Sequence, residues 1–280
     1  MGTVTGRIEE IKQPRGGFIS ISSFDVLKMD DGVVLNDKEN IKGTTVGVAV
    51  DYLTRFMMGT DVEDAFLIPM AGAVIAEEAG DYDSIVYADS LISSITGLDD
   101  VSIKNACSLV YYDNWYRNPL ASMMSMGIYE DCPDQDTVEN VRNFVKRCLS
   151  FFNKYGPVIK SGFAFGPAKS DQEKYKRMKE SGKGVYGGYT PIVSQGDGDY
   201  LTEETMWDLK VLRSKPASKH TLQLLMYWVM GQHSGQEVYK YLKNIGIFNP
   251  RFNVAYTLEM SKVDEKIIKK IENDIICYEG

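Results

Sequence analysis

The chain has 280 residues, of which 44% are hydrophobic, a composition typical of a soluble globular protein. Its length allows one large domain or two small ones. The formal net charge of −8 argues against a protein that coats nucleic acid, because phosphate binding relies on Lys and Arg. This charge still allows basic side chains to line a single groove while acidic side chains gather elsewhere.

The cysteine pattern and the hydropathy favour a cytoplasmic protein. The four cysteines are scattered and form no C-x-x-C pair: Cys107, Cys132, Cys148 and Cys277. This spacing argues against a structural zinc or an iron–sulfur cluster and fits reduced thiols. The opening residues lack the apolar core of a signal peptide, and no apolar run approaches the roughly 18–20 residues that span a membrane. We therefore expect no contact with a membrane.

The beginning of the chain is expected to combine an extended arm with one helix. Residues 1–43 read as a loop-rich segment with several turn signals. Apolar and small residues alternate over 17–24, which favours a strand or an extended arm. Apolar residues at helical spacing then predict a helix over 44–58, with Thr44 or Thr45 as its N-cap.

Residues 60–155 are expected to be helical throughout. The helices predicted from apolar spacing and from glycine or proline punctuation are 62–78, 82–95, 100–116 and 137–155. Pro69 predicts a kink or a break in the first of them. Large aromatic and methionine side chains are expected to form a core rather than a binding surface: Tyr111, Tyr112, Trp115, Tyr116, Met123, Met124 and Met126.

Beyond residue 155 short apolar segments alternate with helical ones, which predicts an α/β core. The predicted strands are 158–165, 189–201, 206–212, 245–248 and 254–258. Helices are predicted over 221–230 and 262–276, and the basic segment 170–183 as a polar helix or loop. Residues 249–253 read as a hairpin turn that exposes Arg251.

Two carboxylates are predicted to face each other in this second half. A tight turn at Glu203-Glu204 joins two predicted strands, and pairing symmetric about it places Asp199 opposite Asp208. Side chains so placed have Cβ atoms roughly 4.5–5.5 Å apart. Carboxylates that close repel each other unless a cation lies between them. Oxygen ligands of this kind suit Mg²⁺ or Mn²⁺.

Lys210 follows Asp208 by two residues, a spacing that points both side chains to the same face of a strand. A lysine there can orient or activate an attacking water and offset charge on a phosphorane. Leu209 turns the other way, and its backbone carbonyl is a further candidate metal ligand. Carboxylate, spacer and lysine on a strand are suited to metal-assisted hydrolysis of a phosphodiester.

The helix predicted next adds polar groups on one face. Gln223 and Tyr227 lie four residues apart, and Lys219 extends their face by another turn. Their side chains are candidates for hydrogen bonds to the metal-site groups or to a DNA phosphate.

The order Gly-x-x-Asp, Asp-x-Lys and Gln-x-x-x-Tyr resembles the PD-(D/E)XK nuclease superfamily and, within it, the RecB-like branch. In this sequence the motifs are Gly196 to Asp199, Asp208-Leu209-Lys210 and Gln223 to Tyr227. The resemblance implies a restriction-endonuclease-like core, with a mixed sheet flanked by helices, that hydrolyses DNA with a bound metal ion. It implies Asp199, Asp208 and Leu209 as metal ligands, Lys210 as the residue that positions water, and Gln223 and Tyr227 as supporting catalytic residues.

The resemblance extends to the start of the chain. Gly47-x-x-x-Asp51 is similar to the Gly-x-x-x-His helix of the branch, with Asp51 in place of the metal-binding histidine. Asp51 is therefore either a further ligand or a simple i,i+4 partner of Arg55. The resemblance implies three regions: the arm and first helix of the nuclease core (1–59), a helical insertion (60–155) and the main α/β nuclease core (156–280). The iron–sulfur cluster of the branch is not expected.

Basic residues in two runs are expected to bind the nucleic acid. The candidates are Lys174 and Arg177 in one run and Arg213, Lys215 and Lys219 in the other. A solvated surface is the alternative interpretation of either run.

Simpler interpretations of the other polar residues stay open. Asp199 and Asp208 also suit ordinary strand-end and turn acids, and Asp197 is either a competing ligand or a cap of the glycine turn. His220 and His233 are expected at the surface, because two histidines without matching cysteines do not make a zinc site.

These observations together predict a metal-dependent deoxyribonuclease that uses Mg²⁺ or Mn²⁺ in the cytoplasm. Bacterial or phage DNA processing, or phage defence, is the expected setting, and a protein partner that delivers the substrate is one expectation. The alternative is a catalytically inactive nucleic-acid-binding or scaffold subunit with a nuclease-like fold.

Overall fold

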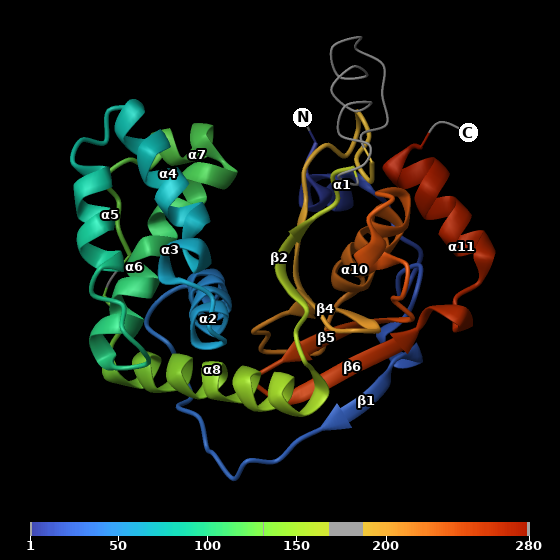
Figure 1. The fold of residues 1–280 in the computed structure, drawn as a ribbon, viewed down its shortest axis with the longest axis horizontal. Helices are drawn as coiled ribbons and strands as arrows, with labels where there is room; N and C mark the ends of the chain where they lie inside the picture. Colours follow the sequence, from blue (N-terminus) through green and yellow to red (C-terminus); the bar gives the residue numbers. More distant parts are fainter. Residues whose placement is uncertain (1, 131, 168–186, 279–280) are drawn as a thin grey trace. The chain divides into compact units, whose positions relative to one another are not determined.

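The computed structural model describes residues 2–130, 132–167 and 187–278 (Figure 1). The chain divides into two compact units. Unit 1 consists of Met1–Met29 and Lys154–Gly280, and unit 2 consists of Asp30–Asn153. The first and last parts of the chain thus belong to one unit, and the helix predicted over 44–58 lies in unit 2. Its assignment to a nuclease core stays a prediction.

The described strands of unit 1 form a six-stranded mixed sheet in the order β1-β6-β5-β4-β3-β2 (Figure 1). The strands are β1 (Asp25–Lys28), β2 (Lys160–Ala164), β3 (Asp197–Leu201), β4 (Thr205–Leu209), β5 (Asn244–Asn249) and β6 (Val254–Glu259). Strands β4 and β5 are parallel, and every other described pair is antiparallel. Helix α10 (Ser218–His233) connects the parallel pair, as a crossover connection requires. An α/β fold with a mixed sheet flanked by helices is therefore confirmed.

One face of this sheet carries the hydrophobic core of unit 1. Residues of β3, β4 and β5 that alternate along each strand, such as Leu201, Met206 and Ile245, pack with the apolar side of α10. Helix α1 (Val4–Glu10), helix α11 (Glu265–Lys270) and the π-helix η5 (Ile271–Ile276) contribute to the same core. Residues between these positions, such as Tyr200 and Trp207, are buried outside this cluster. The odd-numbered residues of β3 and the even-numbered residues of β4 therefore face this core.

Unit 2 is helical. Its helices are α2 (Gly43–Met57), α3 (Val62–Ala65), α4 (Leu67–Glu78), α5 (Ser84–Ile92), α6 (Asp100–Arg117), α7 (Pro119–Met124) and α8 (Gln135–Tyr155), whose last two residues belong to unit 1. Helices α2, α4, α5 and α7 all contact α6. Helix α4 crosses α6 closely, because a Cβ on Gly72 would lie 1.8 Å from the Tyr112 carbonyl oxygen. No described helix is both long and apolar enough to span a bilayer.

Several predicted boundaries differ from the structure. The arm predicted over 17–24 is not a strand, and β1 starts at Asp25 instead. Helix α1 was not predicted, because seven residues are too few to display a period. Strand β3 is shorter than 189–201, since Pro191 cannot donate to a ladder. The helix predicted over 62–78 breaks at Phe66, and Pro69 lies in the first turn of α4, where a missing N–H costs little.

The expected core of unit 2 is only partly correct. Tyr112 and Trp115 are buried, but Tyr116 is 46%, Met123 50% and Met124 90% exposed. Helix α7 is only 6 residues long, and Ser122 is its buried residue. These methionines therefore lie at the surface.

Candidate active site

The two predicted carboxylates lie on neighbouring strands in the predicted register. Strand β3 pairs with β4 through Tyr200–Trp207 and Leu201–Met206, so the next position of the same register is Asp199 with Asp208. Both have the parity of Leu201 and Met206 and thus stand on the face that α10 covers.

The regular ladder between these strands stops at this point. Thr202 and Thr205 form a hydrogen-bonded pair, and such pairs recur at every second position of an antiparallel ladder. A regular ladder would therefore have the N–H of Leu209 donating to the carbonyl of Gly198. Instead, Leu209 N–H donates to Oδ2 of Asp199 over 2.7 Å. Asp199 thereby ties the end of β3 to β4 through its side chain. The same bond fixes the orientation of the carboxylate.

Asp208 and Lys210 form an ion pair on this face. The Lys210 Nζ lies 3.0 Å from Oδ1 of Asp208, and the Asp208 side chain is 2% exposed against 24% for Lys210. The predicted common direction of these two side chains is therefore confirmed. Lys210 N–H donates to the Phe248 carbonyl of β5, which holds its backbone at the end of the parallel pair. The backbone of Lys210 is thus fixed against β5, and its ammonium is paired with Asp208 while the side chain stays partly exposed to solvent.

Helix α10 brings an amide and a phenol to the same carboxylates. Gln223 Nε2 donates to the Tyr227 hydroxyl over 2.9 Å. Burial raises the pKa of Tyr227 well above its ordinary value, and the negative charges of Asp197, Asp208 and Asp199 raise it further. Tyr227 therefore stays protonated. Because its oxygen accepts from Gln223, its O–H remains available to donate.

Glycines of the first motif let other groups approach. A Cβ on Gly198 would lie 2.2 Å from the ring of Phe163 on β2, and one on Gly196 would lie 2.7 Å from Val4 of α1. Tyr189 O–H donates to the Gly196 carbonyl over 2.6 Å. The glycines of this segment thus serve packing around the carboxylates rather than a ligand.

His220 was expected at the surface and is half-buried in the first turn of α10. Its Nδ1 accepts from the N–H of Ala217 over 2.9 Å, at the start of α10. Burial lowers the pKa of His220 to about 4, and the positive charges of Lys210 and Lys219 lower it further. A neutral imidazole whose Nδ1 accepts carries its proton on Nε2. The spacing of His220, Gln223 and Tyr227 on one helical face was a signal in the sequence that could have identified it.

Most of the predicted basic residues lie beside the site or outside the described part of the chain. Arg213 and Lys215 are exposed in the connection between β4 and α10, and Lys219 is exposed in the first turn of α10. Lys174 and Arg177 lie outside the described residues. Arg251 was expected to be exposed, but it is 9% exposed, since the turn after β5 folds its side chain inward.

Asp51 lies on α2 of unit 2 and forms the simpler of its two expected interactions. Arg55 Nε donates to its Oδ1 over 3.2 Å, four residues along the helix. A role of Asp51 as a metal ligand stays a prediction.

No family model, curated protein or solved structure matches the chain. In the part of the chain that the structure describes, no group of three or more His, Cys, Asp or Glu side chains is arranged to hold a metal ion.

Proposed function

We propose that unit 1 hydrolyses phosphodiester bonds of DNA with a bound Mg²⁺ or Mn²⁺, on a restriction-endonuclease-like core of the PD-(D/E)XK type. The observation that carries the proposal is the convergence of three separate motifs on one face of the sheet. Asp199, Asp208 and Lys210 come from β3 and the end of β4, and Gln223 with Tyr227 comes from α10. Ordinary strand-end acids would not require this convergence.

The donor atoms fit a hard divalent cation. Mg²⁺ is usually bound by one or two carboxylates, and water or substrate phosphate completes its shell. Asp199 and Asp208 supply two carboxylates, and the carbonyl of Leu209, the residue after Asp208, is a further candidate donor. The bond from Leu209 N–H occupies one position on Asp199, and a carboxylate has further lone pairs for a cation. Asp197 shares the face of Asp199 and is the alternative second ligand.

The bound cation would supply charge neutralisation for the phosphate and acidify a water molecule. Lys210 would hold the attacking water and stabilise charge that develops on the phosphate, because its ammonium is anchored at Asp208. Tyr227 would donate its O–H toward the carboxylates and fix their orientation, with Gln223 holding the phenol in place. His220 stays neutral at physiological pH, so Nε2–H is a hydrogen-bond donor beside Lys210.

The substrate would be held by the basic residues next to this site. Arg213, Lys215 and Lys219 are exposed between β4 and the start of α10 and would contact phosphate groups. Lys174 and Arg177 are proposed for the same role. We propose the cytoplasm as the setting, supported by four free cysteines, with bacterial or phage DNA processing or phage defence as the process, and with a protein partner that delivers the DNA.

The experiment that tests this function is cleavage of linear, circular and single-stranded DNA by the full chain with Mg²⁺, Mn²⁺ or EDTA. Asp208→Ala and Lys210→Ala are compared with Lys240→Ala, which changes an exposed lysine of unit 1 outside the site. Cleavage that needs the cation and is lost only in the first two variants would support the proposal. Absence of both cleavage and cation binding by calorimetry would leave a nucleic-acid-binding or scaffold role.

A further inference from the structure

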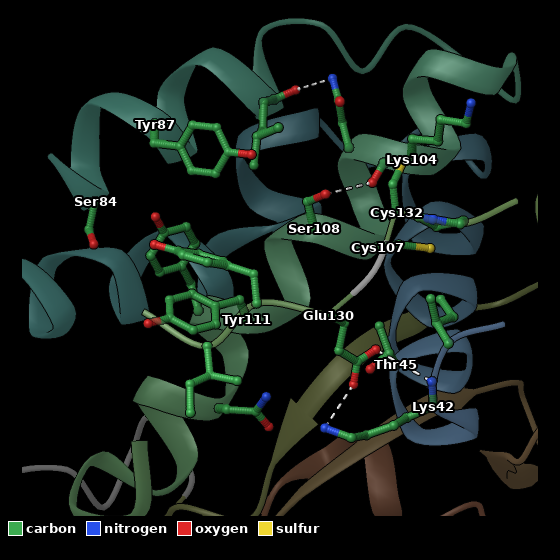
Figure 2. A pocket seen from close by; sticks show the side chains of 18 of the residues that line it. Lys42, Thr45, Ser84, Tyr87, Lys104, Cys107, Ser108, Tyr111, Glu130 and Cys132 are labelled. Atoms are coloured by element: carbon green, nitrogen blue, oxygen red, sulfur yellow. Dashed lines mark hydrogen bonds and ion pairs between the residues drawn. The ribbon is translucent and has the colours of Figure 1, made fainter. Parts of the chain in front are cut away.

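Unit 2 contains a cavity of about 910 Å³ that the proposed nuclease site does not use (Figure 2). Its wall comes from α5 and α6, from the start of α2 and from the segment that follows α7. The volume lies within the roughly 300–1,000 Å³ range of small-molecule sites.

Tyrosines dominate this wall. Among the described residues, five line the cavity: Tyr82, Tyr87, Tyr111, Tyr112 and Tyr129. Tyr82 is 83%, Tyr87 47% and Tyr129 52% exposed, although aromatic rings of this size are normally covered. Figure 2 shows Tyr87 and Tyr111 reaching into the region from different helices. The cavity therefore offers exposed aromatic faces from more than one side.

The central ring is held in a fixed orientation. The Tyr111 hydroxyl donates to Asp81 over 2.8 Å and accepts from the Gly127 N–H over 3.1 Å. The ring of Tyr129 lies against it, with centroids 4.5 Å apart and planes tilted by 35°. Burial raises the pKa of Tyr129 to about 12, so its hydroxyl is neutral. A preorganised ring pair of this kind loses little entropy when a flat ligand stacks on it.

The charged groups of the wall balance one another, and the remaining polar groups are neutral. The charged residues that line the cavity are Lys42, Asp83, Lys104 and Glu130, and their formal charges cancel. Lys42 Nζ lies 3.1 Å from Oε1 of Glu130, so that pair is already formed (Figure 2). Amide and hydroxyl oxygens of the wall are further acceptors, since Asn105 Nδ2 already donates to the Leu91 carbonyl and the Ser108 hydroxyl to the Lys104 carbonyl. The wall thus offers no excess positive charge to hold an isolated phosphate, whereas a flat, polar and neutral group fits inside it.

We propose that this cavity binds a nucleoside: a planar base that stacks on the tyrosines and a sugar that hydrogen-bonds to the hydroxyl and amide side chains. Stacking on aromatic rings tolerates every base, since each has a π-face. The nucleoside has two possible sources, a free molecule or one unit of a single-stranded nucleic acid, and both present a planar base on a pentose. The site stands on residues of unit 2 alone and does not depend on the proposed nuclease activity.

Calorimetric titration of the full chain in EDTA tests this proposal. The ligands are adenosine, a ten-nucleotide deoxyadenylate strand, phenol and inorganic phosphate. We expect saturable binding of adenosine, of the strand or of both, and none of phosphate. Tyr129→Ala should weaken this binding about tenfold, because stacking contributes that much per base. Tyr129→Phe, which keeps the ring, should weaken it about twofold at most.

Two further variants separate loss of the site from loss of the fold. Tyr87→Ala removes a half-exposed ring from helix α5 and should weaken binding in the same way. Tyr241→Ala removes a ring that is 62% exposed in unit 1 and should leave binding unchanged. Tighter binding of the strand than of adenosine would identify the strand as the source, and equal or weaker binding the free nucleoside. Binding of neither, binding of phenol as tight as adenosine, or indifference to Tyr129→Ala and Tyr87→Ala would overturn the proposal.

Discussion

In unit 1 the candidate catalytic carboxylates stand on neighbouring strands, whereas in unit 2 the tyrosines of the cavity stand on two helices and on irregular segments. Backbone register fixes Asp199 against Asp208, and Asp208 is 2% exposed. The rim of the cavity is open, with Tyr82 83% exposed. The first site is therefore defined by the backbone and the second by side-chain packing.

This difference affects which substitutions each site can tolerate and which ligands it can recognise. A group fixed by strand pairing can be held within the narrow limits that bond cleavage needs. Exposed rings on short segments can adjust to ligands of slightly different shape. Substitutions should accordingly have sharp, residue-specific effects in unit 1 and graded effects in unit 2, and the following predictions test that contrast.

The largest effect is expected from Asp208→Ala. Loss of this carboxylate removes a metal ligand and the anchor of the Lys210 ammonium together, so cleavage should fall at least about 10³-fold. Cleavage rates at saturating Mg²⁺ measure it. Tyr129→Ala in unit 2 provides the matched comparison and should leave cleavage of double-stranded DNA unchanged. Equal loss of activity in both variants would break the contrast between the units.

One glycine in each unit tests whether the surroundings leave room for a Cβ atom. Gly198→Ala should lower the free energy of unfolding by about 1–3 kcal/mol, because its Cβ would lie 2.2 Å from the Phe163 ring. Gly47→Ala on α2 meets nothing within 4 Å and should raise the free energy by about 0.5–1 kcal/mol, since alanine favours helix. Urea unfolding measures both. Similar values for the two variants would contradict the proposed constraint at β3.

The register of β3 with β4 could be predicted because a short turn joins them. Pairing symmetric about Glu203-Glu204 has only one natural solution, and the apolar residues beside the turn agree with it. The direction of Lys210 and the helix that carries Gln223 and Tyr227 followed from the same local periodicities. Contacts between residues close in sequence are therefore the predictable part of the candidate site.

Pairings between distant segments could not be predicted. Strand β1 pairs with β6 from the other end of the chain. Its two apolar residues, Val26 and Leu27, are adjacent and both exposed, so β1 lacks the alternation of apolar and polar residues that identifies a strand in a sequence. Strand β2 pairs with β3 across a long connection. No local pattern states which segment an edge strand will join, because that choice depends on the packing of the whole sheet.

The exposure of the tyrosines in unit 2 could not be predicted from the sequence either. Tyr112 is 1% and Tyr116 46% exposed, although both lie on α6 and are separated by one helical turn. Aromatic spacing indicates which residues share a helical face but not which faces a neighbouring helix covers. For this reason a core was expected where part of a cavity lies.

Tyr227→Phe removes one hydroxyl from the unit 1 site and nothing else. Because the carboxylates remain, we expect about a tenfold loss of cleavage at unchanged affinity for DNA. The free energy of unfolding should fall by about 1 kcal/mol, since Gln223 Nε2 loses its acceptor. Single-turnover rates and chemical unfolding measure the two effects. Gln223→Ala should reproduce most of the kinetic loss if the amide acts through the phenol, whereas an unaffected rate would assign it a packing role only.

A dependence of stability on pH is expected to arise at His220. Its pKa is lowered to about 4 in the folded protein from the ordinary value of about 6.5, because of burial and the charges of Lys210 and Lys219. Between these two values the unfolded chain binds more protons than the folded one, so stability must rise with pH over this interval. His220→Gln should flatten the rise. His233→Gln changes the other histidine, at the far end of the same helix, and should retain the part of the slope that His220 produces. Thermal unfolding midpoints of the three proteins between pH 4 and pH 7 measure it, and a slope that survives in His220→Gln would show that the imidazole is not held neutral by the unit 1 site.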